Sequence, residues 1–162
     1  MSVLITGATG FIGKRLLKAV DEKIKILSRN KNSEYETIIC DLGQNKIPAN
    51  SLDGVETIFH LAGIAHNTDG NDKNVENYQK VNVNATIDLA NLAVKNSVKR
   101  FIFVSSIKAG GSLKCGKVIN ENFVKTPEEA YGRSKRLAEI ELLKNEEKLP
   151  LMSWSSNCFQ LR

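Results

Sequence analysis

The chain has 162 residues, of which 41% are hydrophobic and 25% are charged, and its formal net charge at pH 7 is +5. This length and composition are typical of a single globular domain with its own core. The basic residues are dispersed among 18 acidic ones, with no basic helix or aromatic cluster, so we expect no nucleic-acid partner.

The N-terminal sequence and the cysteines restrict the class of protein further. No apolar run is long enough to span a membrane, and no basic segment precedes the first strand-like run. We therefore expect a cytoplasmic protein without a membrane partner. The three cysteines are widely spaced and form no CxxC pair, and the two histidines lie six residues apart, so we expect neither a disulfide framework nor a metal site; these residues are Cys40, Cys115, Cys158, His60 and His66.

Hydrophobic periodicity predicts strands that alternate with helices along the chain. The expected strands are 3–6, 24–28, 36–40, 55–61 and 99–106, and the expected helices are 11–20, about 75–96 and 130–147. In the first helix the apolar residues expected to face inward are Phe11, Ile12, Leu16, Leu17 and Val20. This alternation favours an α/β fold with a doubly wound parallel sheet covered by helices on both faces.

Three glycines stand between the first strand and the first helix, in the sequence TGATGFIG (residues 6–13). At the carboxyl end of a parallel strand, Gly7 allows a tight turn and Gly10 allows a pyrophosphate to approach the backbone. Gly13 allows the helix to pack on the strand, and the free N–H groups of the helix start attract phosphate. A purely steric turn is the alternative. The position, spacing and flanking elements together favour dinucleotide binding.

The end of the second strand bears on the choice of cofactor. An acidic residue about 20 positions after the first glycine would bind the ribose 2′-hydroxyl of NAD. Here the residues are Ser28 and Arg29, and a guanidinium suits the 2′-phosphate of NADP. An exposed surface arginine is the alternative, so the expected cofactor is NADP or NAD.

Three side chains predict proton transfer near this loop. The sequence YGRSK puts Tyr131 and Lys135 four residues apart, on one face of a helix. Tyrosine is a poor base at neutral pH, and a cation one turn away favours its phenolate form. Ser106, at the end of the fifth strand, lies at the same sheet edge as the glycine loop and can hydrogen-bond a substrate oxygen.

These motifs together resemble the extended short-chain dehydrogenase/reductases, in the NAD-dependent epimerase/dehydratase branch that acts on nucleotide sugars. The resemblance covers about residues 2–149, and TGATGFIG is similar to the family's cofactor loop. It implies cofactor contacts by Tyr131, Lys135 and the residues Gly7, Thr9, Gly10, Phe11, Ile12, Gly13, Ser28, Arg29, Asp41, Leu42, Leu61, Ala62 and Gly63. The sequences DL (41–42) and HLAG (60–63) resemble the family's adenine-contacting pair and the segment beside the cofactor.

The resemblance also implies a catalytic set and a reaction. NVNAT (82–86) resembles the family's NVxGT, which implies that Asn82 supports the site. FVSSIKAGG followed by AYGRSK is similar to the Ser…YxxxK core, and aligning Gly111 with the glycine that closes the family's serine loop implies Ser106 rather than Ser105. Tyr131 would take the proton of a sugar hydroxyl while a hydride leaves the same carbon.

The sub-family and the partners are likewise implied by resemblance. SSIK and TPEEAYGRSK are most similar to bacterial surface-polysaccharide enzymes, such as UDP-N-acetylhexosamine 4-epimerases and related dehydrogenase/reductases. The expected substrate is a UDP-sugar, and the family's four-helix interface implies a homodimer through 82–96 and 131–147. Epimerase and dehydrogenase or reductase activities remain alternatives.

Residues 150–162 depart from the family pattern, because no apolar strand or family motif follows Pro150. We expect a dinucleotide-binding Rossmann domain over 1–149 and an irregular tail over 150–162, with the C-terminal strands and substrate domain missing. A truncated epimerase or reductase with impaired activity is one hypothesis. A non-catalytic NAD(P)-binding module and an inactive remnant are the alternatives.

Overall fold

A computed structural model describes residues 2–65, 75–111 and 126–144 of the chain. Its sheet has five strands in the order β3-β2-β1-β4-β5, and every pair is parallel. The strands are β1 (Ser2–Thr6), β2 (Lys23–Ser28), β3 (Glu36–Ile39), β4 (Val55–His60) and β5 (Arg100–Phe103). The expected doubly wound α/β fold is confirmed, and the strand order reverses between β1 and β4.

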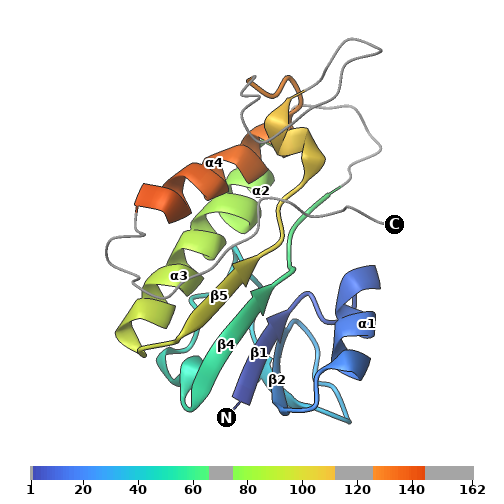
Figure 1. Cartoon of the computed structure of the whole chain (residues 1–162). Helices are drawn as coiled ribbons and strands as arrows, with labels where there is room; N and C mark the ends of the chain where they lie inside the picture. The colour runs from blue at the N-terminus through green and yellow to red at the C-terminus, as the bar shows by residue number, and fades with distance from the viewer. Residues whose placement is uncertain (1, 66–74, 112–125, 145–162) are drawn as a thin grey trace.

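Helices lie on both faces of this sheet (Figure 1). Helix α1 (Phe11–Ala19) covers one face, and α3 (Ala85–Lys95) and α4 (Ala130–Lys144) lie side by side on the other. Short helical segments complete the described part: α2 (Val75–Tyr78), the π-helical η3 (Gln79–Asn84), and the 3₁₀ helices η1 (Ala49–Leu52) and η4 (Ile107–Gly110).

Within the described ranges, the core consists of two apolar clusters separated by the sheet. Side chains alternate along a strand, so Leu4 of β1 packs toward α3 and α4, whereas Val3 and Ile5 pack toward α1. The central strand β1 is therefore buried along its whole length. Phe101 and Phe103 of β5 complete the cluster beneath α3 and α4. This packing fixes the carboxyl ends of β1, β4 and β5 at one edge.

Three expectations need correction. The strand expected over 99–106 is β5, which ends at Phe103, so Ser105 and Ser106 lie in the segment after the strand. The helix expected over about 75–96 is a succession of α2, the π-helical η3 and α3. The i→i+5 hydrogen bonds of a π-helix are a backbone feature that the spacing of apolar residues did not distinguish from α-helix. Phe11, expected to face inward, is 71% exposed. It is the first residue of α1, and the Arg15 guanidinium lies 3.6 Å from the centre of its ring.

The tail expected over 150–162 and the last expected turn of α4 lie outside the described residues. The domain boundary at 149 therefore stays a prediction. Among the helices of the described ranges, none combines the length and the apolar character that a membrane crossing requires.

Candidate functional site

The glycine loop between β1 and α1 is defined by close backbone approaches. Gly7 has φ +69°, and a Cβ there would lie 2.7 Å from the backbone nitrogen of Ala62. A Cβ on Gly13 would overlap the carbonyl oxygen of Gly7 and lie 2.6 Å from Cα of Ala8. The amide of Gly10 donates to the carbonyl of Gly7 at 3.0 Å. The tight turn at Gly7 and the close packing at Gly13 thus have a steric basis that only glycine satisfies.

A cavity of about 340 Å³ opens over this loop, at the carboxyl ends of β1 to β4. Most of the residues predicted to contact a cofactor line it: Gly7, Thr9, Gly10, Ser28, Arg29, Asp41, Leu42, Leu61, Ala62 and Gly63. Phe11, Ile12 and Gly13 belong to the adjoining first turn of α1 and are not among the lining residues. The cavity thus brings together residues separated by up to 74 positions in the sequence, from Gly7 to Val81.

The residues around the cavity are compatible with a phosphate at the start of α1. The first turn of α1 contains no acidic residue, so nothing there opposes a phosphate at the helix N-terminus. Arg29 is exposed at the rim, and the half-buried Asp41 lines the same cavity. The glycines keep the floor free of side chains, which allows the backbone N–H groups to reach a ligand.

Asn82 links two segments that border the site. Its side chain is buried within η3, and its Oδ1 accepts from the amide of Ile64 at 2.8 Å. Its Nδ2 donates to the carbonyl of Ile64 and to Oγ of Ser134, both at 3.0 Å. Asn82 therefore holds the chain after β4 against α4. Sequence reasoning missed Ser134, although it lies inside the YGRSK motif.

A fully buried chain of hydrogen bonds, also missed by sequence reasoning, is centred on His60. Thr6 Oγ1 lies 2.7 Å from Nδ1 of His60, and Thr86 Oγ1 lies 2.8 Å from Nε2. Thr86 donates its own proton to the carbonyl of Asn82, so it accepts from His60 Nε2–H, and Thr6 donates to Nδ1. Every member is satisfied when the imidazole is neutral. Burial, with a smaller contribution from Lys135, lowers the pKa of His60 to about 3.

Lys135 and Tyr131 lie on α4 as the YxxxK spacing predicts. Lys135 is buried, and its Nζ lies 4.0 Å from the centre of the Phe103 ring. A Cβ built on Gly63 would lie 4.0 Å from the same Nζ, so this ammonium borders the segment that lines the cavity. Tyr131 is half-buried, and its ring centre lies 6.1 Å from that of Tyr78 in α2.

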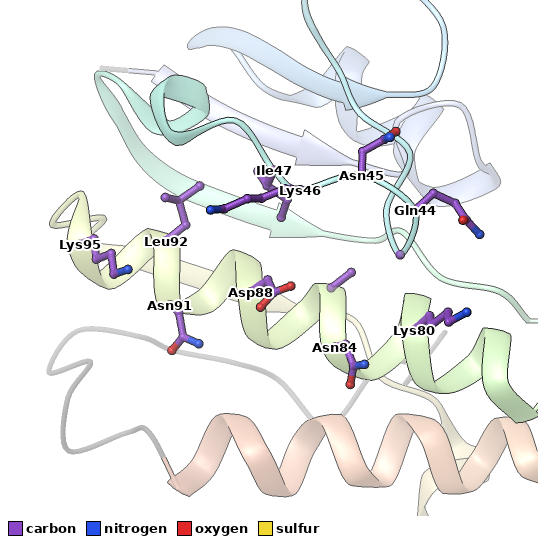
Figure 2. A pocket seen from close by; sticks show the side chains of 12 residues that line it. Gln44, Asn45, Lys46, Ile47, Lys80, Asn84, Asp88, Asn91, Leu92 and Lys95 are labelled. Carbon is purple, nitrogen blue, oxygen red and sulfur yellow. The ribbon is translucent and has the colours of Figure 1, made fainter.

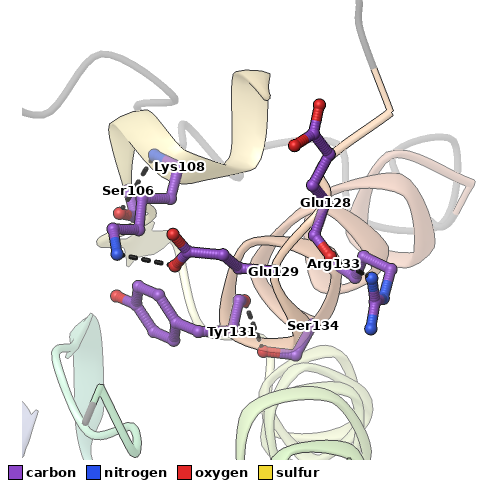
Figure 3. A network of polar contacts seen from close by, with 7 residues as sticks. All are labelled: Ser106, Lys108, Glu128, Glu129, Tyr131, Arg133 and Ser134. Atoms are coloured by element: carbon purple, nitrogen blue, oxygen red, sulfur yellow. Dashed lines mark hydrogen bonds and ion pairs between the residues drawn. The ribbon is translucent and has the colours of Figure 1, made fainter. Parts of the chain in front are cut away.

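The two serines after β5 differ in environment. Ser106 precedes η4, and its Oγ accepts from the amide of Lys108 at 3.3 Å. Figure 3 shows Ser106 and Lys108 near the N-terminal end of α4, on the side toward which the ring of Tyr131 extends. Ser105 is buried, and its Oγ has no hydrogen-bond partner among the described residues. The role expected for Ser106 stays a prediction.

A second cavity, of about 520 Å³, lies apart from the glycine loop, between residues 43–47 and α3 (Figure 2). Its polar walls include Lys46, Lys80, Asp88 and Lys95. None of the predicted site residues lines it, so it is distinct from the dinucleotide cavity.

A doubly wound sheet with a glycine-floored cavity at its strand-order reversal defines the class of dinucleotide-binding α/β proteins. The model of the NAD dependent epimerase/dehydratase family matches residues 3–155. The chain therefore belongs to this family.

Individual relatives and a solved structure agree with this membership. UDP-glucose 4-epimerase of Vibrio cholerae is 34% identical over 155 residues, which are 88% of this chain and 46% of the relative. An N-acetyl-α-D-glucosaminyl-diphospho-ditrans,octacis-undecaprenol 4-epimerase of Escherichia coli O157:H7 is 34% identical over 85% of this chain and 41% of its own length. A uronate dehydrogenase of Pseudomonas syringae is 27% identical over 85% of this chain and 51% of its own length. The structure of MoeE5 in complex with UDP-glucose and NAD superposes with a TM-score of 0.81 at 27% identity, covering 95% of this chain and 52% of that one. The chain spans about half the length of these relatives.

Proposed function

We propose that this chain carries the dinucleotide site and the Ser–Tyr–Lys group of an NAD(P)-dependent enzyme that transfers a hydride at a hydroxyl-bearing carbon of a UDP-sugar. The observation that carries the proposal is the cavity at the strand-order reversal, with the predicted cofactor residues around it and the Lys135 ammonium at its border. Family membership and relatives that act on nucleotide sugars support the same reaction class.

The residues of the cavity have distinct binding roles in this proposal. The N–H groups at the start of α1 hold the pyrophosphate, and Asp41 and Leu42 contact the adenine, as the family resemblance implies. The segment 61–63 lies beside the nicotinamide. A nicotinamide dinucleotide, when bound, supplies the acceptor and donor of the hydride.

Proton movement belongs to the side chains of α4 and the loop after β5. Tyr131 takes the proton of the sugar hydroxyl, while Ser106 hydrogen-bonds the same oxygen. The cation of Lys135, one turn along α4, favours the phenolate form of Tyr131. Asn82 acts at a distance from the reacting atoms, because its hydrogen bonds fix Ile64 and Ser134 on either side of the site.

Relatives of this chain include both epimerases and dehydrogenases, so the fate of the hydride has two forms. In an epimerase the hydride returns to the opposite face of the same carbon. In a dehydrogenase or reductase the oxidised or reduced product is released. A non-catalytic dinucleotide-binding module is the alternative, and it predicts cofactor binding without turnover.

The proposed assembly is a homodimer through α3 and α4. Four apolar side chains on these helices are partly exposed: Val94, Leu137, Ile140 and Leu143. Side chains of this kind gathered on two neighbouring helices are typical of a helix–helix interface. Packing against another part of the protein is the alternative.

Calorimetric titration of NAD and NADP tests the binding part of the proposal. Gly10→Val should weaken the binding of both cofactors, because a branched side chain blocks the approach of the pyrophosphate to the backbone. Gly110→Ala is the matched control, since a Cβ at Gly110 would meet no atom within 4 Å. Binding that is equally tight in Gly10→Val would contradict a phosphate seat at this loop.

The same titration tests the cofactor preference. If Arg29 contacts a 2′-phosphate, Arg29→Ala lowers the affinity for NADP and leaves that for NAD unchanged. An unchanged NADP/NAD ratio makes Arg29 a surface residue only. Turnover of UDP-glucose that is abolished in Tyr131→Phe would establish the catalytic role, whereas binding without turnover would favour the non-catalytic module.

A further inference from the structure

An ion pair that the proposed reaction does not use lies beside Tyr131. Nζ of Lys108 in η4 lies 2.6 Å from Oε2 of Glu129, just before α4. The two side chains are 47% and 59% exposed, so solvent and ligands can reach both. Figure 3 shows the pair next to the Tyr131 hydroxyl, whereas Glu128 points away from it. The pair therefore places a hydrogen-bond donor and an acceptor beside the hydroxyl of Tyr131, one of the predicted catalytic residues.

The backbone beneath this pair is held in place. A Cβ on Gly132 would lie 2.5 Å from the carbonyl oxygen of Lys108 and 3.0 Å from Cβ of Pro127, so η4 and α4 are in direct contact. The amide of Lys108 donates to Oγ of Ser106, and the carbonyl of Glu129 accepts from the amide of Arg133 at 2.9 Å. The ion pair therefore has a fixed position relative to α4, although its side chains are exposed.

The Lys108 ammonium is also in electrostatic contact with the neighbouring phenols. The Glu129 carboxylate raises the pKa of Lys108, and Tyr131 and Tyr78 add smaller contributions in the same direction. Lys108 therefore stays protonated at neutral pH. A sugar whose reacting hydroxyl meets Tyr131 would present the substituents of its neighbouring carbons to this ammonium.

We propose that the Lys108–Glu129 pair is a specificity-determining element that favours an uncharged sugar over one that carries a carboxylate next to the reacting carbon. A sugar hydroxyl both donates and accepts, so it can bond the Glu129 carboxylate and the Lys108 ammonium together. A sugar carboxylate accepts only, and Glu129 both repels it and occupies its natural partner. The inference rests on the proposed function.

The two charges have opposite expected effects, which allows a sharp test. Ligand-observed NMR titration of the NAD-saturated chain would compare UDP-glucose with UDP-glucuronate. Glu129→Gln should raise the affinity for UDP-glucuronate relative to UDP-glucose by about two- to fivefold, the range expected for exposed charge pairs. Lys108→Met should lower that ratio. Glu128→Gln is the matched control, because it removes the same charge at the adjacent position and should leave the ratio unchanged.

Each other outcome overturns the inference in a recognisable way. An equal change of the affinity ratio in Glu128→Gln and Glu129→Gln would mean that the effect comes from the overall charge of this surface and not from the ion pair. An unchanged ratio in Glu129→Gln, or no binding of either UDP-sugar to a chain that binds NAD, would remove the specificity role but leave the dinucleotide site intact. Failure to bind NAD itself would overturn the proposed function, which is a separate result.

Discussion

Two junctions between a loop and a helix use the same packing device but present different surfaces. In α1, Gly13 lies against the carbonyl of Gly7, and in α4, Gly132 lies against the carbonyl of Lys108. In both places a helix glycine allows backbone to approach backbone more closely than any side chain permits. The first junction presents glycine backbone without side chains beside a cavity, whereas the second presents charged and phenolic side chains.

The comparison shows that a close glycine contact can either leave backbone groups accessible or fix the position of neighbouring side chains. At the first junction, Gly7 and Gly10 also lack side chains, so the backbone itself faces the cavity. At the second, Lys108, Glu129 and Tyr131 project from a backbone that the Gly132 contact has fixed. Backbone donors suit a phosphate, and fixed side chains suit a sugar whose hydroxyls must be distinguished.

The largest expected effects come from filling these close approaches. An alanine in a helix interior normally stabilises by about 1 kcal/mol relative to glycine, yet Gly13→Ala and Gly132→Ala should each destabilise by about 1–3 kcal/mol. Gly7→Ala should cost about 1–2 kcal/mol more than Gly13→Ala, because its φ of +69° is left-handed. Urea unfolding measures the free energies, with Gly110→Ala as the control. A stabilised Gly132→Ala variant would show that the second junction is not tightly packed.

The first junction could be predicted from the sequence and the second could not, for a physical reason. Three glycines between a strand and a helix form a local pattern, so TGATGFIG indicates both position and role. Gly132 is one glycine in a polar helix, and its partner lies 24 positions earlier in the chain. The Lys108–Glu129 pair is equally non-local. Periodicity likewise could not distinguish the π-helical turn that carries Asn82 from continuous α-helix.

A smaller but pH-dependent effect is expected at His60, whose ring bonds Thr6 of β1, the strand before the first junction, and Thr86 of α3. Its folded pKa of about 3 lies below the unfolded value near 6.5, so the unfolded chain binds the extra proton between these pH values. Stability from this group is complete above pH 6.5 and is lost as the pH falls toward 3. The loss should reach about 2 kcal/mol by pH 5.

The contribution of His60 can be measured by comparing the free energies of unfolding of the wild type and of His60→Gln between pH 7 and pH 5. The variant lacks the titrating group, so its stability should decline less steeply than that of the wild type, by up to about 1.4 kcal/mol per pH unit. Parallel declines in the two proteins would assign the acid sensitivity to the carboxylates instead. Glu36 is one such carboxylate, since Lys23 and then Lys25 lower its pKa.

Substitutions of the partly exposed apolar residues Leu137 and Ile140 of α4 should affect assembly more than folding. Leu137→Lys combined with Ile140→Lys places charges on side chains that are each 36% exposed, so the monomer should keep its fold. If these residues form the proposed dimer interface, light scattering should show a dimer for the wild type and a monomer for the variant. A monomeric wild type at high concentration would refute the dimer. Glu141→Lys, a charge change elsewhere on α4, is the control.

The smallest effect on stability is expected from breaking the ion pair at the second junction. Lys108 and Glu129 are about half exposed, and exposed pairs contribute little because water and salt screen them. Lys108→Met should therefore leave the melting temperature close to that of the wild type, whereas Gly132→Ala lowers it. A melting temperature that falls as far in Lys108→Met as in Gly132→Ala would mean that the side chains, rather than the backbone contact, hold η4 against α4. The Lys108–Glu129 pair would then be a structural salt bridge. Its two side chains would not be available to form hydrogen bonds with a sugar.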